Sequence, residues 1–244
     1  ILGNDGAVIR TFSNQSKEDK LTDLKAGGNR FVWNLRYPNA KKFDGLILWS
    51  TGLGGPRVVP GDYRVRLTVK GQSEEQPFAV LPDPRAGARP EDFQQQFMFV
   101  KACYNKLSEI HGAIADIRDV RAQMKNLSDR LPKEERMKPL RDQIKTVDSL
   151  MTAVEQTLYQ TKNRSGQDPL NYPVRLNDKL GNLMELASDG DFPPTDQARE
   201  VRDLLFSQID VELAKWTAVQ ERELPVVNRL VRELGVEIIK VKEE

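Results

Sequence analysis

The positions of hydrophobic and polar residues divide the chain into two regions, with a change at Leu81–Pro84. Before this point apolar and polar residues alternate and glycine-containing turns interrupt the pattern, which is typical of short β-strands. After it, apolar residues recur at steps of three and four and glycine becomes rare, as in amphipathic helices. We therefore expect an α+β protein, with residues 1–84 as an antiparallel β-sandwich and residues 85–244 as a helical bundle.

The first region contains four runs that predict strands, joined by turn sequences. The strand runs are Ala7–Phe12, Asn29–Leu35, Tyr63–Val69 and Gln76–Leu81. Tight turns are expected at Gly3–Gly6, at Pro60–Asp62 and at Gly71, because glycine, proline and aspartate supply the backbone angles of such turns. Short strands at this spacing favour a sandwich. The stretch 38–59 is rich in glycine and basic residues and predicts a loop with at most one strand, Leu46–Trp49.

Two long helices are predicted at the start of the second region. Arg89–Asp92 places proline and acidic residues where a helix begins, and Pro132 interrupts the apolar pattern. The first stripe consists of Phe93, Phe97, Val100, Tyr104, Leu107, Ile110, Ile114, Ile117, Met124 and Leu127, and the second of Met137, Leu140, Ile144, Val147, Met151, Val154 and Leu158. Helices of roughly 30–35 residues would be about 50 Å long. We expect them to pair as an antiparallel hairpin.

Two further helices complete the expected up-down antiparallel four-helix bundle. A shorter third helix follows Tyr172–Pro173, and Thr195 is a suitable N-cap for a fourth. Pro225 should kink or restart that fourth helix, and Gly235 should end the short helix that follows. Val236–Val241 predicts a terminal strand or an ordered tail.

Charge and composition narrow the classes of function. The chain of 244 residues has 37 basic and 36 acidic side chains spread evenly, so it lacks the basic face of a nucleic-acid-binding protein. No apolar run is long enough to span a bilayer, and we expect no membrane insertion. The chain begins with Ile1–Gly3, which resembles the middle of a strand, so we expect that a natural N-terminal part has been removed.

Candidate chemistry is sparse, and we predict no catalytic residue, no cofactor and no metal site. His111 is the single histidine and Cys103 the single cysteine; both lie beside the apolar stripe, where packing roles are expected. The glycines of Ser50–Arg57 lack the Gly-Lys-Ser/Thr ending of a phosphate loop, so this segment is interpreted as a mobile or partner-contacting loop. The many carboxylates follow the polar helix faces and are explained by a solvated surface.

Five residues are candidates for contacts with a ligand or partner. Tyr172, Arg175 and Asn177 belong to the unusual run Asn171–Lys179, which serves either helix capping and interhelical hydrogen bonds or a ligand site. Trp49 is expected at the seam between the two regions, where it could instead offer a platform to a sugar. Arg57 follows the glycine-rich segment.

Four runs resemble the C-terminal region of bacterial exported proteins with an N-terminal β-propeller of Asp-box (neuraminidase-type) or sortilin-like repeats. The runs are Asn29–Pro38, Gly55–Val69, Leu170–Leu180 and Leu224–Leu230. The first two are also similar to the Ig-like domain of flagellar hook-capping proteins, so the resemblance implies an Ig-like sandwich. It further implies an extracytoplasmic location and a propeller as partner. Such proteins are often labelled glycosyl hydrolases, but the Asp-box signature does not occur in this sequence, and no catalytic residue of the family maps onto it.

Two hypotheses of function follow. In the first, the chain is a non-catalytic accessory or interaction module that packs beside the propeller and uses its long helices for self-association or a partner protein. In the second, the chain belongs to a glycan-acting hydrolase, and a cleft near Trp49, Arg57 or Arg175 completes its active site or binds carbohydrate.

Overall fold

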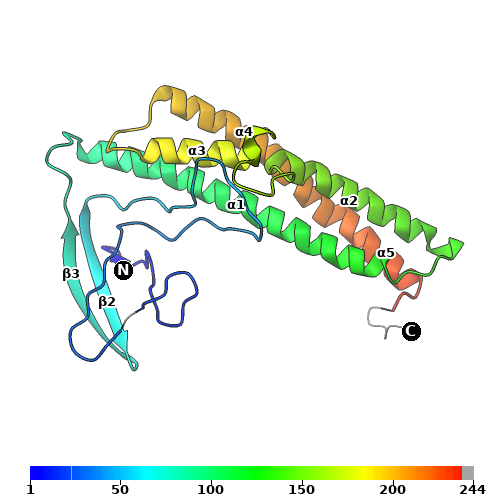
Figure 1. The fold of residues 1–244 in the computed structure, drawn as a ribbon, viewed down its shortest axis with the longest axis horizontal. Coiled ribbons are helices and arrows are strands. Elements are labelled where there is room, and N and C mark those ends of the chain that lie inside the picture. The colour runs from blue at the N-terminus through cyan, green and yellow to red at the C-terminus, as the bar shows by residue number, and fades with distance from the viewer. Residues whose placement is uncertain (23, 238–244) are drawn as a thin grey trace.

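The computed structural model describes residues 1–22 and 24–237, which form an α+β arrangement of one small sheet beside an elongated group of helices (Figure 1). The antiparallel sheet has the order β1 (Leu2–Gly3), β2 (Gly61–Val69), β3 (Gln72–Val80). The helices are α1 (Pro90–Ser128), α2 (Lys138–Leu158), α3 (Leu176–Ser188), α4 (Asp196–Ala218) and α5 (Leu224–Glu233). Short 3₁₀ turns cover Glu135–Met137 and Asp168–Leu170, and a π-helical segment, Val219–Glu223, joins α4 to α5. The sheet ends at Val80 and α1 begins at Pro90, on either side of the predicted boundary.

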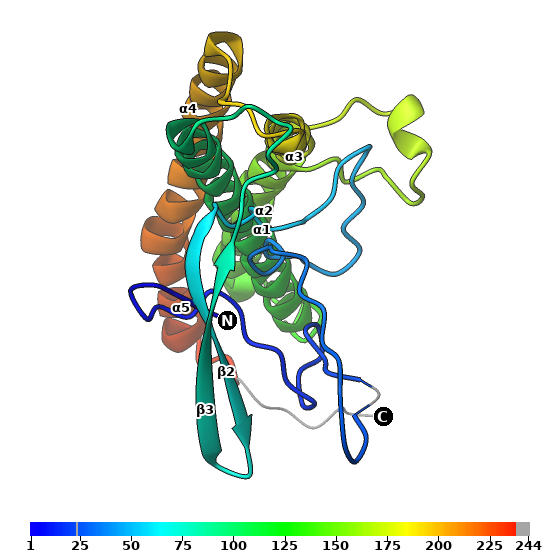
Figure 2. The same cartoon turned by 90° about the vertical axis from the view of Figure 1, so that its left-hand side faces the viewer.

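The β2–β3 hairpin is the most regular part of the N-terminal region, and it extends away from the helices (Figure 2). Its strands join through Lys70 and Gly71, whose φ angles of 51° and 84° are those of a tight hairpin turn. Tyr63 lies on one face of β2, where its ring stacks on Phe78 at 5.8 Å and meets the edge of Trp33 at 6.4 Å. The predicted turn at Gly71 is therefore confirmed, and Trp33 packs against the small buried cluster of this region.

Two of the predicted strands are not formed, and those predictions were wrong. Ala7–Phe12 and Asn29–Leu35 are irregular, and Val8 makes an isolated bridge to Leu2. The stretch 38–59 is a loop, as predicted, and Leu46–Trp49 does not form a strand in it. Leu35, the last residue of the second run, adopts a φ of 58°, a left-handed angle that an extended strand cannot contain, so a strand could not continue through it. Across residues 1–22 and 24–237 the strands make one sheet, and the second sheet of a sandwich is not formed.

The helices begin and end near the predicted signals, but α1 has 39 residues and α2 only 21, so the expected length of roughly 30–35 residues was wrong for the second helix. The Thr195 hydroxyl accepts a hydrogen bond from the Ala198 N–H at 3.1 Å, as expected of an N-cap. Pro225 lies in the first turn of α5, directly after the π-helical segment, so its missing N–H falls where the hydrogen-bond pattern of the helix changes, and Gly235 follows α5 with a φ of 63°. Of the predicted final strand or tail, residues 238–241 lie outside the described residues.

The order of the helices differs from an up-down four-helix bundle. Side-chain contacts place Gln96 of α1 beside Ala187 of α3, and Arg121 of α1 beside Asp148 of α2. Both α3 and α2 therefore run antiparallel to α1, α3 along its N-terminal part and α2 along its C-terminal part. The connection 159–175 carries the chain onward without reversing it (Figure 1).

The bundle thus consists of three helical columns around one core. The first is α1, the second is α2 followed by α3, and the third is α4, the π-helical segment and α5. Arg199 contacts Gln95 and Asp210 contacts Lys106, so the third column runs parallel to α1. The apolar stripes of all columns meet in a continuous interior whose largest fully buried side chains include Phe99, Leu107, Ile110, Ile114, Ile117, Leu140, Met151, Leu158, Leu180 and Ile209.

Candidate functional site

Residues 38–57, here called the crossing loop, lie over the helices where α2 ends and α3 begins. Four backbone N–H groups of this loop donate to side chains of the bundle. These bonds run from Lys41 to Ser108 Oγ (3.2 Å), from Ile47 to the Tyr159 hydroxyl (3.2 Å), from Trp49 to Asp178 Oδ1 (2.9 Å) and from Gly52 to Glu185 Oε2 (3.1 Å). The loop is therefore bound to the bundle along much of its length, whereas the sequence predicted a mobile or partner-contacting segment at Ser50–Arg57.

His111 is completely buried beneath this loop, between α1 and α3. Its Nδ1 lies 2.6 Å from the Lys41 carbonyl oxygen, so Nδ1 carries the hydrogen that is donated. Its Nε2 lies 3.3 Å from the Asn177 amide nitrogen, from which it accepts. Burial lowers the pKa of His111 to about 4, although the Lys41 carbonyl acts in the opposite direction. The imidazole is therefore neutral at pH 7, and both of its nitrogens are used in holding the loop and α3 together.

Asp178 fixes the backbone of Trp49 at the start of α3. This carboxylate is buried, and the Trp49 N–H lies 2.9 Å from Oδ1 and 3.2 Å from Oδ2. Burial raises the pKa of Asp178, and the hydrogen bond from Trp49 opposes that rise. The Asn182 amide completes the contact by donating to the Trp49 carbonyl at 3.0 Å. The main-chain N–H and carbonyl of Trp49 are therefore the groups that contact the bundle at the seam between the two regions.

A charged cluster lies next to the same seam. Glu155 of α2 is buried and accepts from Arg118 Nε at 2.7 Å and from Arg121 Nη1 at 2.6 Å. Arg118 also donates to the Asp44 carbonyl at 2.8 Å and lies over the Phe43 ring, 4.6 Å from its centre. The two arginines compensate the negative charge of the buried Glu155 carboxylate. One of them, Arg118, also binds the crossing loop.

Cys103 lies in the apolar interior of α1 and is completely buried. Burial raises the pKa of its thiol to about 12, with the nearby Arg202 acting in the opposite direction. The thiolate is the reactive form of cysteine, so this side chain is chemically inert in the folded protein at pH 7.

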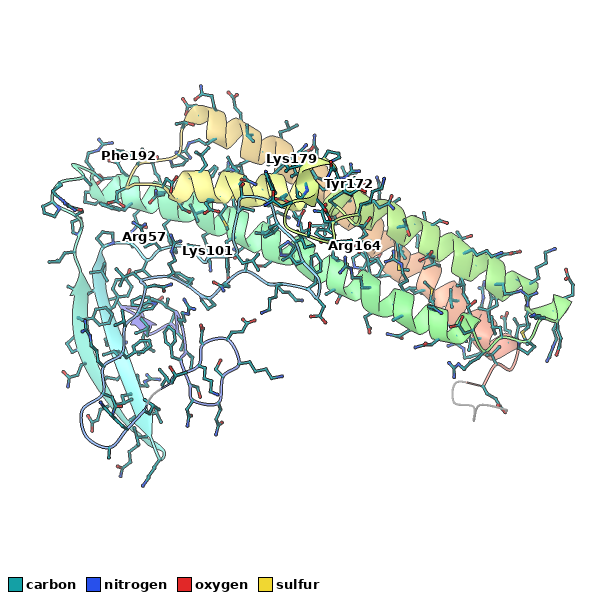
Figure 3. All side chains as sticks on the ribbon, in the orientation of Figure 1. Arg57, Lys101, Arg164, Tyr172, Lys179 and Phe192 are labelled. Atoms are coloured by element: carbon teal, nitrogen blue, oxygen red, sulfur yellow. The ribbon has the colours of Figure 1, made fainter. Side chains whose placement is uncertain are left out.

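The five candidate residues from the sequence do not converge on one site. Asn177 contacts His111, and Trp49 is bound one residue further along α3 at Asp178. Arg57 pairs with Asp191, 3.3 Å away, beyond the other end of α3, and Figure 3 shows it well separated from Tyr172. Tyr172 is half-exposed, and the Lys162 ammonium lies 5.5 Å from its ring centre.

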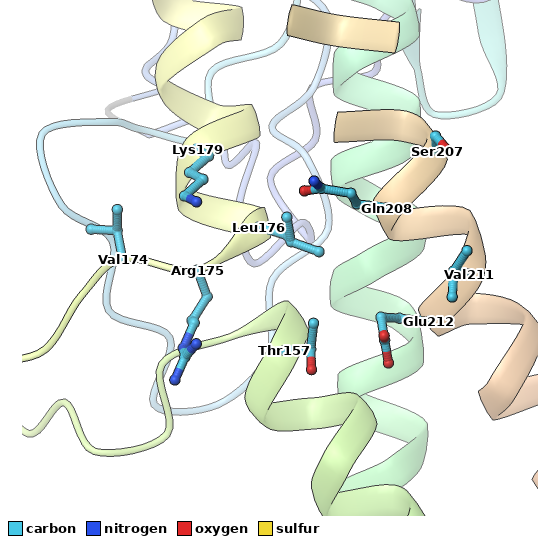
Figure 4. Close-up of a pocket in the computed structure, with 9 residues that line it drawn as sticks. All are labelled: Thr157, Val174, Arg175, Leu176, Lys179, Ser207, Gln208, Val211 and Glu212. Atoms are coloured by element: carbon cyan, nitrogen blue, oxygen red, sulfur yellow. The ribbon is translucent and has the colours of Figure 1, made fainter. Parts of the chain in front are cut away.

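Arg175 faces a different space, an open cavity of about 410 Å³ at the break in the second column (Figure 4). The cavity is lined by residues of α2, the start of α3 and α4, namely Thr157, Val174, Arg175, Leu176, Lys179, Ser207, Gln208, Val211 and Glu212. Gln208 extends from α4 toward α3 in Figure 4. Glu212 is buried and pairs with Lys215 at 2.7 Å. Within the described ranges, Arg175 and Lys179 have no side-chain hydrogen bond or ion pair, and the buried Arg175 Nε lacks a partner.

Sequence reasoning missed Asp178, Asn182 and Glu155, whose partners lie far away along the chain. A glycine inside α3, Gly181, was a signal in the sequence that could have indicated this contact. A Cβ at Gly181 would lie 2.9 Å from the Thr51 side chain, so this glycine allows the crossing loop to approach α3 closely. Interior helix glycines therefore mark where a loop contacts a helix.

Within the part of the chain that the structure describes, no group of three or more histidine, cysteine or acidic side chains is arranged to hold a metal ion. None of the helices in that part is long and apolar enough to cross a membrane. Comparisons with known proteins gave no matching family, no matching curated protein and no matching solved structure. The fold and the seam thus define the chain as an α+β protein whose crossing loop joins a small sheet to a three-column helical bundle.

Proposed function

We propose that this chain is a non-catalytic interaction module of a larger extracytoplasmic bacterial protein, and that its β2–β3 hairpin packs against the N-terminal β-propeller of that protein. The observation that supports the proposal is the uncovered apolar face of β2. Leu67 and Val69 are 61% and 56% exposed, and Val65 points to the same side. Contiguous exposed apolar side chains of this kind mark protein–protein contacts.

The two faces of the hairpin differ in chemistry. On the face of Leu67 the opposing residues on β3 are Gln76, opposite Val65, and Glu74, opposite Leu67. On the other face Arg64 and Arg66 both pair with Glu75, at 3.1 and 2.6 Å, and this face is suited to water. β1 pairs only with Tyr63 and Arg64, so the edge of β2 beyond them has open backbone groups that a further strand could use.

The identity of the partner comes from the resemblance of Asn29–Pro38 and Gly55–Val69 to propeller-linked and hook-capping proteins. In this proposal residues 1–84 are an Ig-like domain with one sheet of their own, and the adjoining domain covers the face that a second sheet covers in a sandwich. Residues 85–244 correspond to a four-helix bundle only in that α1, α2, α3 and α4 share one core.

The test uses the chain and the separately produced propeller domain of the parent protein, with binding measured by titration calorimetry. Leu67→Asp should weaken binding by about tenfold or more, because it places an unpaired charge in an apolar contact. Thr68→Asp introduces the same charge on the opposite face and should leave affinity unchanged. Absence of binding by the unaltered chain, or equal binding by both variants, would overturn the proposal.

The alternative, a glycan-acting hydrolase, requires a cleft with convergent carboxylates near Trp49, Arg57 or Arg175. Of the carboxylates beside these residues, Asp178 accepts from the Trp49 N–H, Asp191 pairs with Arg57, and Glu212 at the Arg175 cavity pairs with Lys215. No specific observation favours this alternative.

A further inference from the structure

The cavity at the break in the second column has a cationic end that the bundle itself does not neutralise. Arg175 precedes α3 and Lys179 lies one turn further along it, so both side chains reach the same space. Within residues 1–22 and 24–237, neither cation pairs with a carboxylate. Glu212, the acidic residue of the lining, is already bound to Lys215. The cavity therefore favours a negatively charged group.

The Arg175 side chain gives a second reason to expect a negatively charged group in this cavity. Its Nε is buried without a hydrogen-bond partner, and a buried donor left in this state is costly in free energy. The guanidinium group offers donors in a fork that matches a carboxylate, whereas Lys179 can serve as a neighbouring point charge. On the opposite wall of the cavity the Gln208 amide extends toward α3, whereas Ser207 lies at the far side, on α4 (Figure 4).

An apolar stripe continues from this cavity along the outer face of α4. Val201, Leu204 and Val211 are 45%, 57% and 53% exposed and recur at helical spacing. Leu186 of α3, 68% exposed, lies two helical turns beyond Lys179 on the same side of its helix. From Val201 to Val211 the stripe extends for about 15 Å at 1.5 Å per residue.

We propose that the cavity and the α4 stripe together, here called the groove, bind an amphipathic segment of a partner protein, with its apolar side chains on the α4 stripe and a carboxylate on Arg175 and Lys179. A small carboxylate would fill the cavity but leave the stripe exposed. A second copy of this chain would cover the stripe, but it would also have to supply a carboxylate to Arg175 and Lys179. The acidic residues beside its own stripe include Asp203 and Asp210, and these carboxylates already pair with Arg202 and Lys106. The combination of two free cations with a long apolar stripe fits an acidic amphipathic segment best. This surface is separate from the hairpin face, so the two proposals can fail independently.

The test is a selection of displayed random peptides of about 12–16 residues, long enough to cover the stripe as a helix. The whole chain serves as the target. The expected peptides combine apolar residues at helical spacing with aspartate or glutamate near one end, and raised salt should weaken their binding. Enriched peptides are then measured by fluorescence anisotropy against three variants.

Arg175→Gln combined with Lys179→Gln should weaken binding by about tenfold or more, and so should Leu204→Asp. The control, Lys133→Gln with Lys145→Gln, removes the same charge from exposed positions away from the groove and should bind normally. Circular dichroism establishes that each variant is folded. Selected peptides that lack acidic residues, or that bind all variants equally, would overturn the proposal.

Two further measurements separate the other occupants. If succinate binds at the two cations and no peptide is selected, the groove is a small-ligand site and the proposal is wrong. If analytical ultracentrifugation shows a dimer that Leu204→Asp dissociates, a second copy is the occupant and the proposal is equally wrong. A monomeric chain with acidic, groove-dependent peptides supports it.

Discussion

The helical region and the sheet region of this molecule bury their apolar side chains to very different degrees. In the helices, an uninterrupted interior runs along all three columns, and side chains such as Leu107 and Met151 are completely enclosed. In the sheet region, the buried cluster consists of Ile9, Val58 and Tyr63, with a few half-buried neighbours. Phe31, Val32 and Leu67 in that region remain largely exposed.

This difference teaches where the stability of the molecule originates. Burial of apolar surface is the main stabilising contribution, so the helical region is able to hold its own structure, whereas the sheet region has little interior of its own. The sheet region is attached through the crossing loop, which contributes Ala40 and Phe43 to the helical interior and adds polar contacts at His111 and Asp178.

The largest expected effect breaks the helical interior. Leu107→Ala should lower the free energy of unfolding by about 2 to 5 kcal/mol, because it leaves a cavity among enclosed side chains. Leu67→Ala removes the same atoms from the exposed hairpin face and should change that free energy by no more than about 0.5 kcal/mol. Urea unfolding followed by far-UV circular dichroism measures both. Similar losses in the two variants would show that the regions are equally packed.

A somewhat smaller effect is expected from pH at the seam. The pKa of His111 is about 4 in the folded chain, against the ordinary value of 6.5 that the solvated imidazole has once the chain unfolds. The neutral form is favoured in the fold, so this contribution to stability is fully present above pH 6.5 and is lost as pH falls toward 4. The total loss is about 3 kcal/mol, at 1.36 kcal/mol per pKa unit.

Urea unfolding at a series of pH values between these limits measures this dependence. His111→Gln removes the titrating group, so the variant should show a shallower decline in stability over the same range. The carboxylates titrate in both proteins, and the difference between the two curves isolates His111. Parallel curves would contradict the predicted role of its burial.

The smallest effect concerns the attachment alone. Asp178→Ala removes the acceptor of the Trp49 N–H, and the loss of this bond should cost about 1 to 2 kcal/mol and loosen the crossing loop. Asp178→Asn keeps an acceptor oxygen and is the matched control. Amide hydrogen exchange at residues 45–53 should accelerate in the alanine variant while the α1 interior stays protected. Equal exchange in both variants would mean that other contacts hold the loop.

The sequence was sufficient for features that depend on neighbours along the chain. The apolar stripe from Met137 to Leu158, the cap at Thr195 and the restart at Pro225 are local, and the helices they predict are present. A stripe specifies which face of a helix is buried but not the direction of the next helix, so the course of α3 was not predictable. At Leu35 an apolar alternation predicted a strand, but a left-handed backbone angle ended it.

The candidate site was harder to foresee for the same physical reason. Asn177 was recognised from an unusual local run, whereas its neighbour Asp178 has its partner on a loop more than a hundred residues earlier in the chain. A carboxylate in the first turn of a helix is ordinarily explained by the helix dipole. Only the folded chain shows that this one is buried against the main chain of Trp49.

The long separation between Trp49 and Asp178 also bears on how the protein is made. The two residues are 129 positions apart. At a synthesis rate of about 5–20 residues per second, roughly 6 to 26 s pass between the addition of one and of the other. The contacts of Lys41 with Ser108 and His111 join residues only 67 and 70 positions apart, so their partners are synthesised earlier. The crossing loop can therefore attach to α1 first, and its contact with α3 is the later event in the biogenesis of the chain.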